Sequence, residues 1–379
     1  MKRRDWLKVA ALGALAPALP ATLMRAAADG PRNDRSWAGI LNVCAWPKLE
    51  RLADGTIVAI IFNQPCHGLW EGDLECWASA DDGRTWKFRS RVTDHAPRTN
   101  RMNCTLGRTK NGDLLVFGSG WDNRNPVGGK PTPASDGKQI RGQIFRSADG
   151  GRTWVLQGLL PEPTPVGLGK NTQFMAFGQI QSGANGTLGA AVYLSPTAIP
   201  RETYFIRSAD DGKTWTVVSQ ISPTGSETAL LHYGDGKWLA AVREYVKPTA
   251  EVQLVLFESN DNGQTWTRGQ EASLPGQIPG HLLRLQDGQT LLTYGNRNFG
   301  NCGVDARISP DNGKSWGPPF RVASYTGWDS GYPSCVQLPD GTVITAYYTS
   351  TDRVMYQMGV ARWHPSELPP VRSMTPKQA

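Results

Sequence analysis

Residues able to do chemistry recur at two kinds of position along this chain of 379 residues. One is the start of the first strand expected in each of six sequence repeats, and the other is the end of the second strand with the loop after it. Carboxylates and imidazoles there could transfer protons, guanidinium groups could bind an anion, and exposed indoles could stack on a sugar ring. The first positions hold Trp46, Asn100, Arg101, Asn171, Glu227, His281 and Tyr332. The second positions hold His67, Glu71, Asp73, Trp121, Asp122, Arg243, Glu244, Arg297 and Tyr348.

The repeats are marked by an eight-residue pattern, Ser-x-Asp-x-Gly-x-(Thr/Ser)-Trp. It occurs five times, beginning at Ser79, Ser147, Ser208, Ser259 and Ser309. Its Asp is suited to accept hydrogen bonds from the N–H groups of a tight turn, and its Gly permits a positive φ. Its Trp can close the turn against a neighbouring strand layer. We therefore expect a structural hairpin at each copy, and no catalytic group.

A second glycine turn lies upstream of most copies, so each repeat reads as four strands joined by turns. Six repeats are expected, beginning near Cys44, Asn100, Asn171, Ser226, Gly280 and Gly331. Four-stranded units repeated around one axis make a β-propeller. The sequence therefore predicts an all-β fold, a six-bladed β-propeller that forms one domain over residues 29–379. Residues 36–43 could supply the outer strand of the sixth blade.

This strand order also assigns the loops to two faces. The glycine turns and the eight-residue patterns fall on one face, while the starts of first strands and the ends of second strands fall on the other. The candidate residues therefore converge on one mouth, where a functional site is expected.

Such eight-residue patterns are termed Asp boxes. A six-bladed chain with Asp boxes on five blades and such residues at the mouth resembles the sialidase superfamily over nearly all of the chain after residue 28. In that family a Glu that opens the fourth blade partners a catalytic Tyr that opens the sixth. Glu227 in GSETALL and Tyr332 in SGYPSCVQL match these two. Arg243 in AAVREY matches the arginine that grips the substrate carboxylate, and Arg297 in YGNRNFG matches a second arginine.

The resemblance implies a glycoside hydrolase in which Tyr332 is the nucleophile and Glu227 takes its proton. This pairing is chemically sensible, because a phenol with a pKa of about 10 is a poor nucleophile until a carboxylate can accept its proton. Sialidases with a Tyr nucleophile differ in this respect from glycosidases that use two carboxylates.

The chain departs from the family pattern in its first and sixth blades. The first arginine of the family's triad falls on Ala45, and the Glu that steadies it is absent from residues 346–349, which read AYYT. A buried carboxylate without its arginine would be costly, so the two losses are consistent with each other. The sequence predicts a poor sialidase whose sugar need not be sialic acid. Polar residues at the start of blade two could replace the missing arginine: Arg98, Asn100, Arg101 and Asn103.

The family's acid/base Asp lies in the loop after the second strand of blade one, here residues 64–73. His67 is nearest to that position, and Glu71 and Asp73 follow closely. An imidazole or a carboxyl can donate a proton to a leaving oxygen, so His67 and Glu71 are the two candidates for that role. Asp73 is a candidate substrate ligand.

Aromatic and polar side chains at the mouth are expected to bind the substrate beside Arg243 and Arg297. Exposed indoles often stack on a pyranose face. The aromatic candidates are Trp46, Trp70 and Trp121, and the polar ones are Arg101, Asn103 and His281.

The favoured interpretation is an exo-acting glycoside hydrolase that cleaves a terminal sugar from a glycan. Three alternatives remain open at this point. Arg243 and Glu227 could form a buried salt bridge, with Tyr332 merely packed at the mouth. A polysaccharide lyase could use His67 or Tyr332 as a base against a uronate, and a propeller without activity could bind a carbohydrate or a protein.

Residues 1–28 resemble a twin-arginine export signal, with Arg3-Arg4 before Trp6-Leu7-Lys8, an Ala/Leu-rich stretch and a run of alanines. This predicts a bacterial periplasmic or secreted protein, and a retained membrane anchor is the alternative. No other stretch approaches the 18 apolar residues of a transmembrane helix, so the mature form is expected to have no membrane partner.

Charge and cysteine content argue against several other classes. The formal charge is +7, of which residues 1–28 contribute +4, so the remainder carries only 7 − 4 = +3. That balance does not suggest a nucleic-acid partner. The six cysteines include no CxxC, so neither a metal site nor a cofactor is expected.

Overall fold

Four-stranded antiparallel sheets make up the part of the chain that the computed structural model describes. That part comprises residues 35–127, 137–163, 172–183, 186–195, 201–246, 251–350 and 355–367. The predicted export signal at residues 1–28 lies outside the described residues. Within them, the structure has no helix long and apolar enough to cross a membrane.

Each repeat of the sequence forms one blade, with the strands in chain order from the centre outward. Blade one contains β2 (Cys44–Arg51), β3 (Ile57–Phe62), β4 (Leu74–Ser79) and β5 (Lys87–Arg91). Blade two contains β6 (Asn103–Arg108), β7 (Leu114–Trp121), β8 (Gln139–Ser147) and β9 (Val155–Leu159). Blade three contains β10 (Phe174–Ser182), β11 (Leu188–Leu194), β12 (Glu202–Ser208) and β13 (Thr216–Ser222). Blade four contains β14 (Gly225–Gly234), β15 (Lys237–Tyr245), β16 (Val252–Ser259) and β17 (Thr267–Glu271).

Blades five and six complete the set. Blade five contains β18 (Gln277–Arg284), β19 (Thr290–Asn296), β20 (Gly303–Ser309) and β21 (Phe320–Ser324). Blade six contains β22 (Gly331–Gln337), β23 (Val343–Ser350), β24 (Tyr356–Trp363) and, at its outer edge, β1 (Ser36–Leu41). A short 3-10 turn, η4 (Pro365–Glu367), follows β24.

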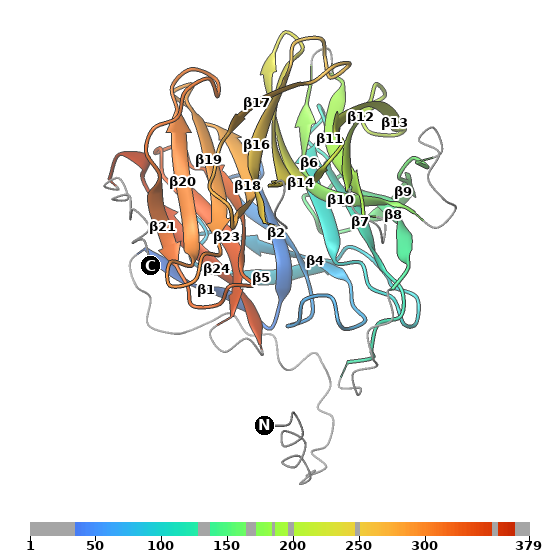
Figure 1. Ribbon diagram of the computed structural model, residues 1–379. Coiled ribbons are helices and arrows are strands. Elements are labelled where there is room, and N and C mark those ends of the chain that lie inside the picture. Colours follow the sequence, from blue (N-terminus) through green and yellow to red (C-terminus); the bar gives the residue numbers. More distant parts are fainter. Residues whose placement is uncertain are drawn as a thin grey trace, which may run out of the picture.

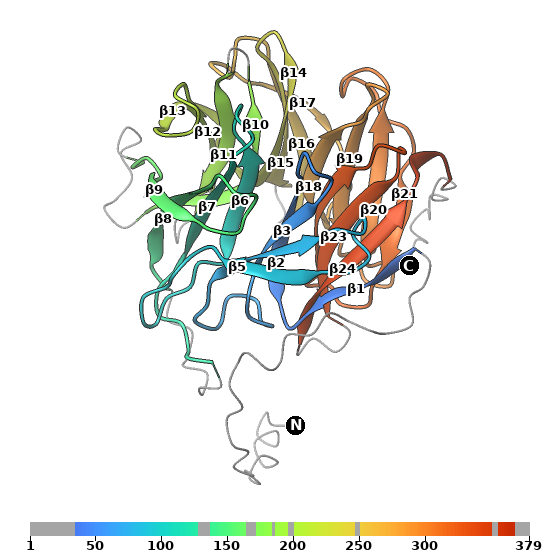
Figure 2. The same cartoon turned by 180° about the vertical axis from the view of Figure 1, so that it is seen from behind.

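The first strands of the blades meet around a common centre (Figures 1 and 2). β2 contacts both β6 and β22, and β10, β14 and β18 continue the ring between those two. β6 and β10 also pair in parallel, with Thr105 opposite Gly178, which joins blades two and three into one eight-stranded sheet. The predicted all-β, six-bladed propeller is confirmed.

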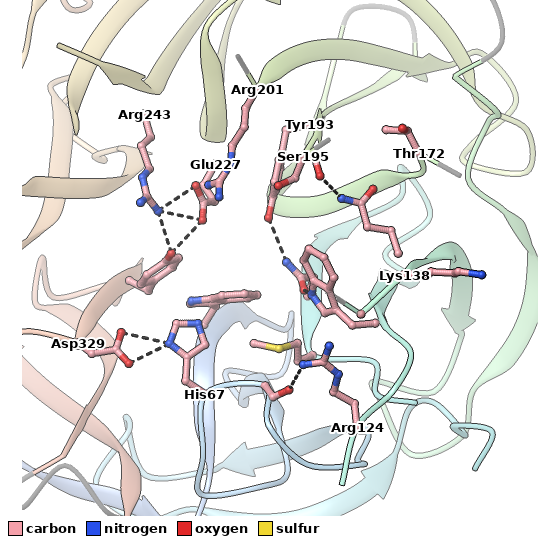
Figure 3. A pocket seen from close by; sticks show the side chains of 18 of the residues that line it. His67, Arg124, Lys138, Thr172, Tyr193, Ser195, Arg201, Glu227, Arg243 and Asp329 are labelled. Carbon is pink, nitrogen blue, oxygen red and sulfur yellow. Dashed lines mark hydrogen bonds and ion pairs between the residues drawn. The ribbon is translucent and has the colours of Figure 1, made fainter. Parts of the chain in front are cut away.

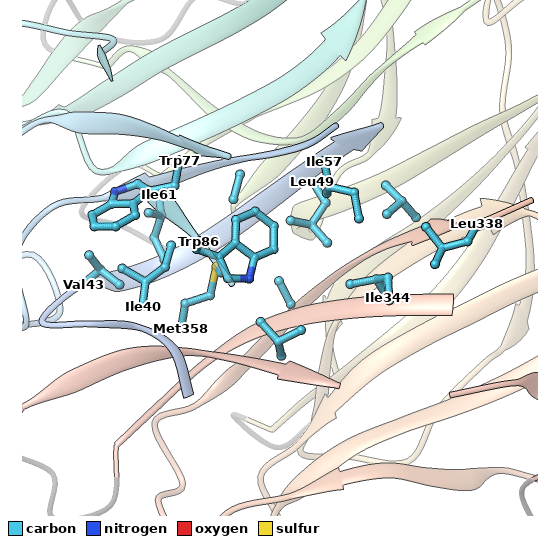
Figure 4. Packing of buried hydrophobic residues seen from close by; sticks show 14 residues of the cluster. Ile40, Val43, Leu49, Ile57, Ile61, Trp77, Trp86, Leu338, Ile344 and Met358 are labelled. Atoms are coloured by element: carbon cyan, nitrogen blue, oxygen red, sulfur yellow. The ribbon is translucent and has the colours of Figure 1, made fainter. Parts of the chain in front are cut away.

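Strand β1 closes the sixth blade from outside. It pairs antiparallel with β24, with Ser36 opposite Ala361, as expected for residues 36–43. Because β2 then begins the first blade, the chain ties blades six and one together. A buried apolar cluster lies between these two blades (Figure 4), and it includes Ile40, Val43, Trp77, Trp86, Ile344 and Met358.

The Asp boxes form the expected turns. In the third box, Ser208 Oγ donates to Asp210 Oδ1 at 2.7 Å, and Thr214 donates to the same carboxylate from its N–H at 2.9 Å and its Oγ1 at 2.6 Å. Gly212 has a φ of 83°, and its carbonyl accepts from Trp215 Nε1 at 3.1 Å. These contacts satisfy the turn internally, so the boxes are structural.

The six cysteines are all buried free thiols. Their burial raises the pKa of each thiol whose shift is resolved, for example that of Cys335 to about 11. Such thiols are poor nucleophiles at neutral pH.

Candidate active site

One cavity of about 880 Å³ opens at the mouth where the starts of first strands and the ends of second strands meet (Figure 3). All six blades contribute to its lining. The aromatic, charged and polar side chains of the lining include Trp46, His67, Asn103, Trp121, Tyr193, Arg201, Glu227, Arg243, Arg297, Asp329 and Tyr332. The face predicted for the site is therefore the one that carries the cavity.

Irregularities at the starts of the first strands turn side chains toward the mouth. Along β22 the register advances three residues, from Gly331 to Ser334, while β23 advances two, and Tyr332 in this bulge has a φ of 54°. The same extra residue occurs in β14 around Glu227. A β-bulge re-aims a side chain, and a positive φ away from glycine costs free energy, so both are typical of functional sites.

Tyr332 and Glu227 meet across the centre, from blades six and four. Tyr332 Oη donates to Glu227 Oε1 at 2.9 Å. Arg243 Nη1 donates to both oxygens of Glu227, at 3.0 and 3.1 Å, and to Tyr332 Oη at 3.2 Å. The structure thus brings together three residues that the sequence assigned to one site.

The charges around Glu227, Arg243 and Tyr332 lower the pKa of the carboxyl and raise that of the phenol. Burial alone would raise the pKa of Glu227, but the positive charges of Arg243 and Arg201 lower it to about 2. Burial, and next the negative charge of Glu227, raise the pKa of Tyr332 well above its usual value. At neutral pH, then, the phenol holds the proton and the carboxylate is ionised and ready to accept it.

Arg297 also contacts the Tyr332 ring. Its guanidinium carbon is 5.1 Å from the centroid of the Tyr332 ring, its Nε donates to the carbonyl of Ser330 at 3.1 Å, and its Nη2 donates to Tyr348 Oη at 3.3 Å. Arg243 and Arg297 line the same cavity. An anion bound above Tyr332 can therefore reach both guanidinium groups.

His67 lines the cavity, and its partner is Asp329, a residue that the sequence reasoning missed. His67 Nδ1 lies 2.9 Å from Asp329 Oδ2. Two phenols donate to the same carboxylate, Tyr348 at 2.7 Å and Tyr356 at 2.8 Å. The loop that leads into β22 carries Asp329, so the argument from strand order could have found it had it included loops before first strands.

Three predicted residues of the blade-one loop do not line the cavity. The carboxylate of Glu71 accepts a hydrogen bond from the backbone N–H of Arg98. Trp70 forms a bridge to Asn125 and is also absent from the lining. Asp73 is buried, where it accepts from Thr93 Oγ1 at 3.0 Å. Their hydrogen bonds hold the loop together, which leaves His67 as the titratable side chain of this loop at the cavity.

Two other predicted ligands also lie away from the cavity. Arg101 Nη1 donates to the carbonyl of Arg141 at 2.8 Å. His281 is buried below the mouth, where its Nε2 accepts from the N–H of Cys335 at 3.1 Å. Burial, and next the charge of Lys48, lower the pKa of His281 to about 3, so it is a neutral packing residue.

Trp46 and Asn103 lie where they were expected. The indole of Trp46 packs beside Tyr332, with ring centroids 5.1 Å apart and planes inclined by 30°. It is only 4% exposed, so it forms a wall behind Tyr332 and offers little free face for a sugar. Asn103 Oδ1 accepts from Trp121 Nε1 at 3.3 Å, which orients the Trp121 indole at the cavity.

Further cations line the cavity that the sequence reasoning did not single out, namely Arg124, Lys138 and Arg201. With Arg243 and Arg297 they make five cations, against two carboxylates, Glu227 and Asp329. Both carboxylates already have partners. Among the described residues, no carboxylate oxygen lies within 4 Å of Arg124, Lys138 or Arg201. The lining therefore favours an anionic ligand.

In the described part of the chain, no group of three or more His, Cys, Asp or Glu side chains is placed to hold a metal ion.

Comparisons with known proteins agree with this architecture. A family model for the BNR repeat-like domain matches residues 93–344. A sialidase from Clostridium perfringens is 25% identical over 240 residues, which cover 58% of this chain and 59% of the relative, so the match spans about three fifths of that enzyme.

Two solved structures have the same fold. A protein of unknown function from Dyadobacter fermentans has a TM-score of 0.72 at 23% identity, covering 87% of this chain and 98% of its own. An alpha-L-arabinanase from Penicillium chrysogenum has a TM-score of 0.63 at 16% identity, covering 88% of this chain and 99% of its own. At such low identity these likenesses show the fold and leave the substrate open.

Proposed function

Because the chain belongs to the BNR repeat-like domain family of the sialidase superfamily, we propose that it is an exo-acting glycoside hydrolase that releases a terminal acidic sugar from a glycan. The observation that carries this proposal is the 2.9 Å hydrogen bond from Tyr332 Oη to Glu227 Oε1 beneath a cavity with an excess of cations. A phenol beside an ionised carboxylate is a nucleophile with its base in place.

In the proposed reaction the sugar's carboxylate binds Arg243 and Arg297, which places the anomeric carbon above Tyr332. The phenolic proton moves to Glu227 as the oxygen of Tyr332 bonds to the anomeric carbon and the bond to the leaving oxygen breaks. That oxygen takes a proton from His67. A water molecule then gives a proton back to His67 and attacks the anomeric carbon, and Tyr332 leaves with the proton held by Glu227. Two displacements at one carbon give retention of configuration.

Arg243 couples substrate binding to the basicity of Glu227. In the site without substrate, Arg243 Nη1 donates hydrogen bonds to both Glu227 and Tyr332. A substrate carboxylate competes with Glu227 for the positive charge of Arg243. When Arg243 interacts less strongly with Glu227, the affinity of the Glu227 carboxylate for a proton increases. Binding of the acidic sugar thus makes Glu227 a better base.

A screen of the purified chain without residues 1–28 tests the proposal. Aryl glycosides of acidic and neutral sugars and uronate polysaccharides should be offered, with release of the aryl group and of ultraviolet-absorbing products both followed. Release of the aryl group from an acidic glycoside supports the hydrolase. An unsaturated product would instead point to a lyase, and binding without any product would point to a carbohydrate-binding propeller.

The protein is expected to be a poor sialidase. Ala45 occupies the position of the family's first arginine and is fully buried, and Trp46 fills the space beside Tyr332. An aryl sialoside should therefore be turned over at least about tenfold less efficiently, in kcat/KM, than the best aryl uronide, since losing one charge-assisted contact costs about 1.5–3 kcal/mol. Steady-state assays on both substrates measure this ratio, and efficient turnover of the sialoside would contradict it.

We also propose that residues 1–28 direct export of the chain through a twin-arginine route. The support is the Arg3-Arg4 pair followed by an apolar stretch. In a bacterial host that has this route, the wild-type chain should be recovered from the periplasm, and the double variant Arg3→Lys, Arg4→Lys should stay in the cytoplasm. Equal distribution of both chains, measured by blotting of cell fractions, would contradict the proposal.

A further inference from the structure

The ring of His67 is held in one orientation at the edge of the cavity. Its edge meets Trp46 at a centroid distance of 5.7 Å and an interplanar angle of 88°, and it meets Tyr348 at 6.1 Å and 79°. Its side chain is 37% exposed. A loop histidine kept only for packing would have no need to keep one face toward a cavity.

Asp329 fixes the state of this ring as well as its position. Its two oxygens lie 3.1 and 2.9 Å from His67 Nδ1 (Figure 3). An ionised carboxylate only accepts hydrogen bonds, so Nδ1 carries a proton. The other ring nitrogen, Nε2, has no hydrogen-bond partner among the described residues and belongs to a ring that lines the cavity. Nε2 is therefore the atom that can exchange a proton with a ligand.

The surroundings keep Asp329 ionised. Burial would raise its pKa, but the hydrogen bond and charge of His67 and the phenol of Tyr348 hold the pKa well below its usual range. Tyr356 donates a further hydrogen bond, and the guanidinium of Arg297 lies 3.9 Å away. The buried thiol of Cys44 is a further titratable neighbour. Asp329 can thus stabilise a positive charge on His67 across the working range of pH.

From this geometry, and resting on the proposed function, we infer that Asp329 is a positioning residue that makes His67 the proton donor and acceptor of the reaction. In the first step the proton on Nε2 passes to the leaving oxygen as its bond to the anomeric carbon breaks, and the imidazole becomes neutral. In the second step Nε2 takes a proton from the attacking water. At the blade-one loop, an imidazole paired with a carboxylate thereby acts as the general acid and base, a role that a carboxyl group could also fill.

Leaving groups of different basicity test this role. A dinitrophenyl group departs without help, whereas a phenyl group needs a proton. Wild type, His67→Ala and Asp329→Asn should be compared on dinitrophenyl, nitrophenyl and phenyl glycosides of one acidic sugar. Both variants should stay within about tenfold of wild type on the dinitrophenyl substrate and lose roughly 10²–10⁴-fold on the phenyl substrate.

Arg297→Lys is the matched control, because Arg297 also neighbours Asp329 but is assigned to the substrate carboxylate. It should lower kcat/KM by a similar factor on all three substrates. If Asp329→Asn behaves like this control, Asp329 supports the carboxylate clamp and the inference is wrong.

A second readout does not depend on turnover. Nitrogen NMR of labelled protein, recorded at a pH high enough that the ring is neutral, reports the tautomer of His67, which should be the Nδ1–H form in wild type and a mixture in Asp329→Asn. An unchanged His67 spectrum in the variant would overturn the inference even if activity falls. If the wild-type chain hydrolyses none of the glycosides, the proposed function fails, while the NMR comparison still decides whether Asp329 controls His67.

Discussion

Replacing Tyr332 with Phe, or Glu227 with Gln, is expected to abolish most hydrolytic activity, and the double variant should be little slower than either single variant. The reason is that Tyr332 Oη donates to Glu227 Oε1 at 2.9 Å, so nucleophile and base act as one unit. Removal of a general base costs roughly 10²–10⁴-fold, and loss of the nucleophile should cost at least as much. Steady-state kcat on the best aryl glycoside measures all three losses.

Stability must be checked alongside, since buried Glu227 is also the ion-pair partner of the half-buried Arg243. Removing one member of a buried ion pair costs about 3–5 kcal/mol, so Glu227→Gln should unfold at a lower denaturant concentration than Tyr332→Phe. Assays belong at a temperature where circular dichroism shows both variants folded. Losses that add fully would show independent roles, and an unimpaired Tyr332→Phe would move the nucleophile away from this residue.

The second large effect is expected at the arginine pair. Arg243→Ala and Arg297→Ala should each raise KM by roughly 10²-fold, since each removes charge-assisted hydrogen bonds worth about 1.5–3 kcal/mol apiece. Arg243→Ala should do more. It takes away the charge that opposes burial at Glu227, whose pKa of about 2 should then rise.

The sign of the pH effect follows from that rise. Glu227 serves as a base only when ionised, and ionisation is lost as the pH falls through its pKa. In Arg243→Ala the acid limb of kcat against pH should therefore move to higher pH, while Arg297→Ala should leave it in place. Profiles of kcat and KM between about pH 3 and 8 would measure both effects. If the acid limb does not move in Arg243→Ala, Arg243 does not control the pKa of the catalytic base.

The fold was predictable because its rules are local. Each Asp box closes with its own hydrogen bonds, as Asp210 does with Ser208 and Thr214, so the pattern alone identifies a hairpin. The spacing of the turns then gave the number of blades, and the outer strand expected within residues 36–43 is β1 (Ser36–Leu41). Two residues at the starts of central strands were predictable for the same reason, since Tyr332 and Glu227 meet as expected, whereas His281 on β18 is buried away from the cavity.

The loops were less predictable, because hydrogen bonds between distant segments decide where their side chains point. Glu71 and Asp73 follow a strand end closely, yet the first accepts from Arg98 and the second from Thr93. Conversely Asp329 and Arg201 line the cavity from the segments that precede β22 and β12, which were not searched for site residues. Their positions depend on contacts between blades, which sequence spacing does not reveal.

The pairing of β1 with β24 also has a consequence for biosynthesis. Ser36 lies opposite Ala361, a separation of 361 − 36 = 325 positions, so β1 is synthesised long before its partner β24. Contacts between such distant residues slow folding, because the intervening chain must be ordered before they form. Until β24 is made, β1 has no strand to pair with, and its unpaired backbone N–H and C=O groups can bind another chain. A ribosome that stops before β24 therefore releases an open ring in which β1 has no partner, so closure of blade six requires that residues 356–363 have been made.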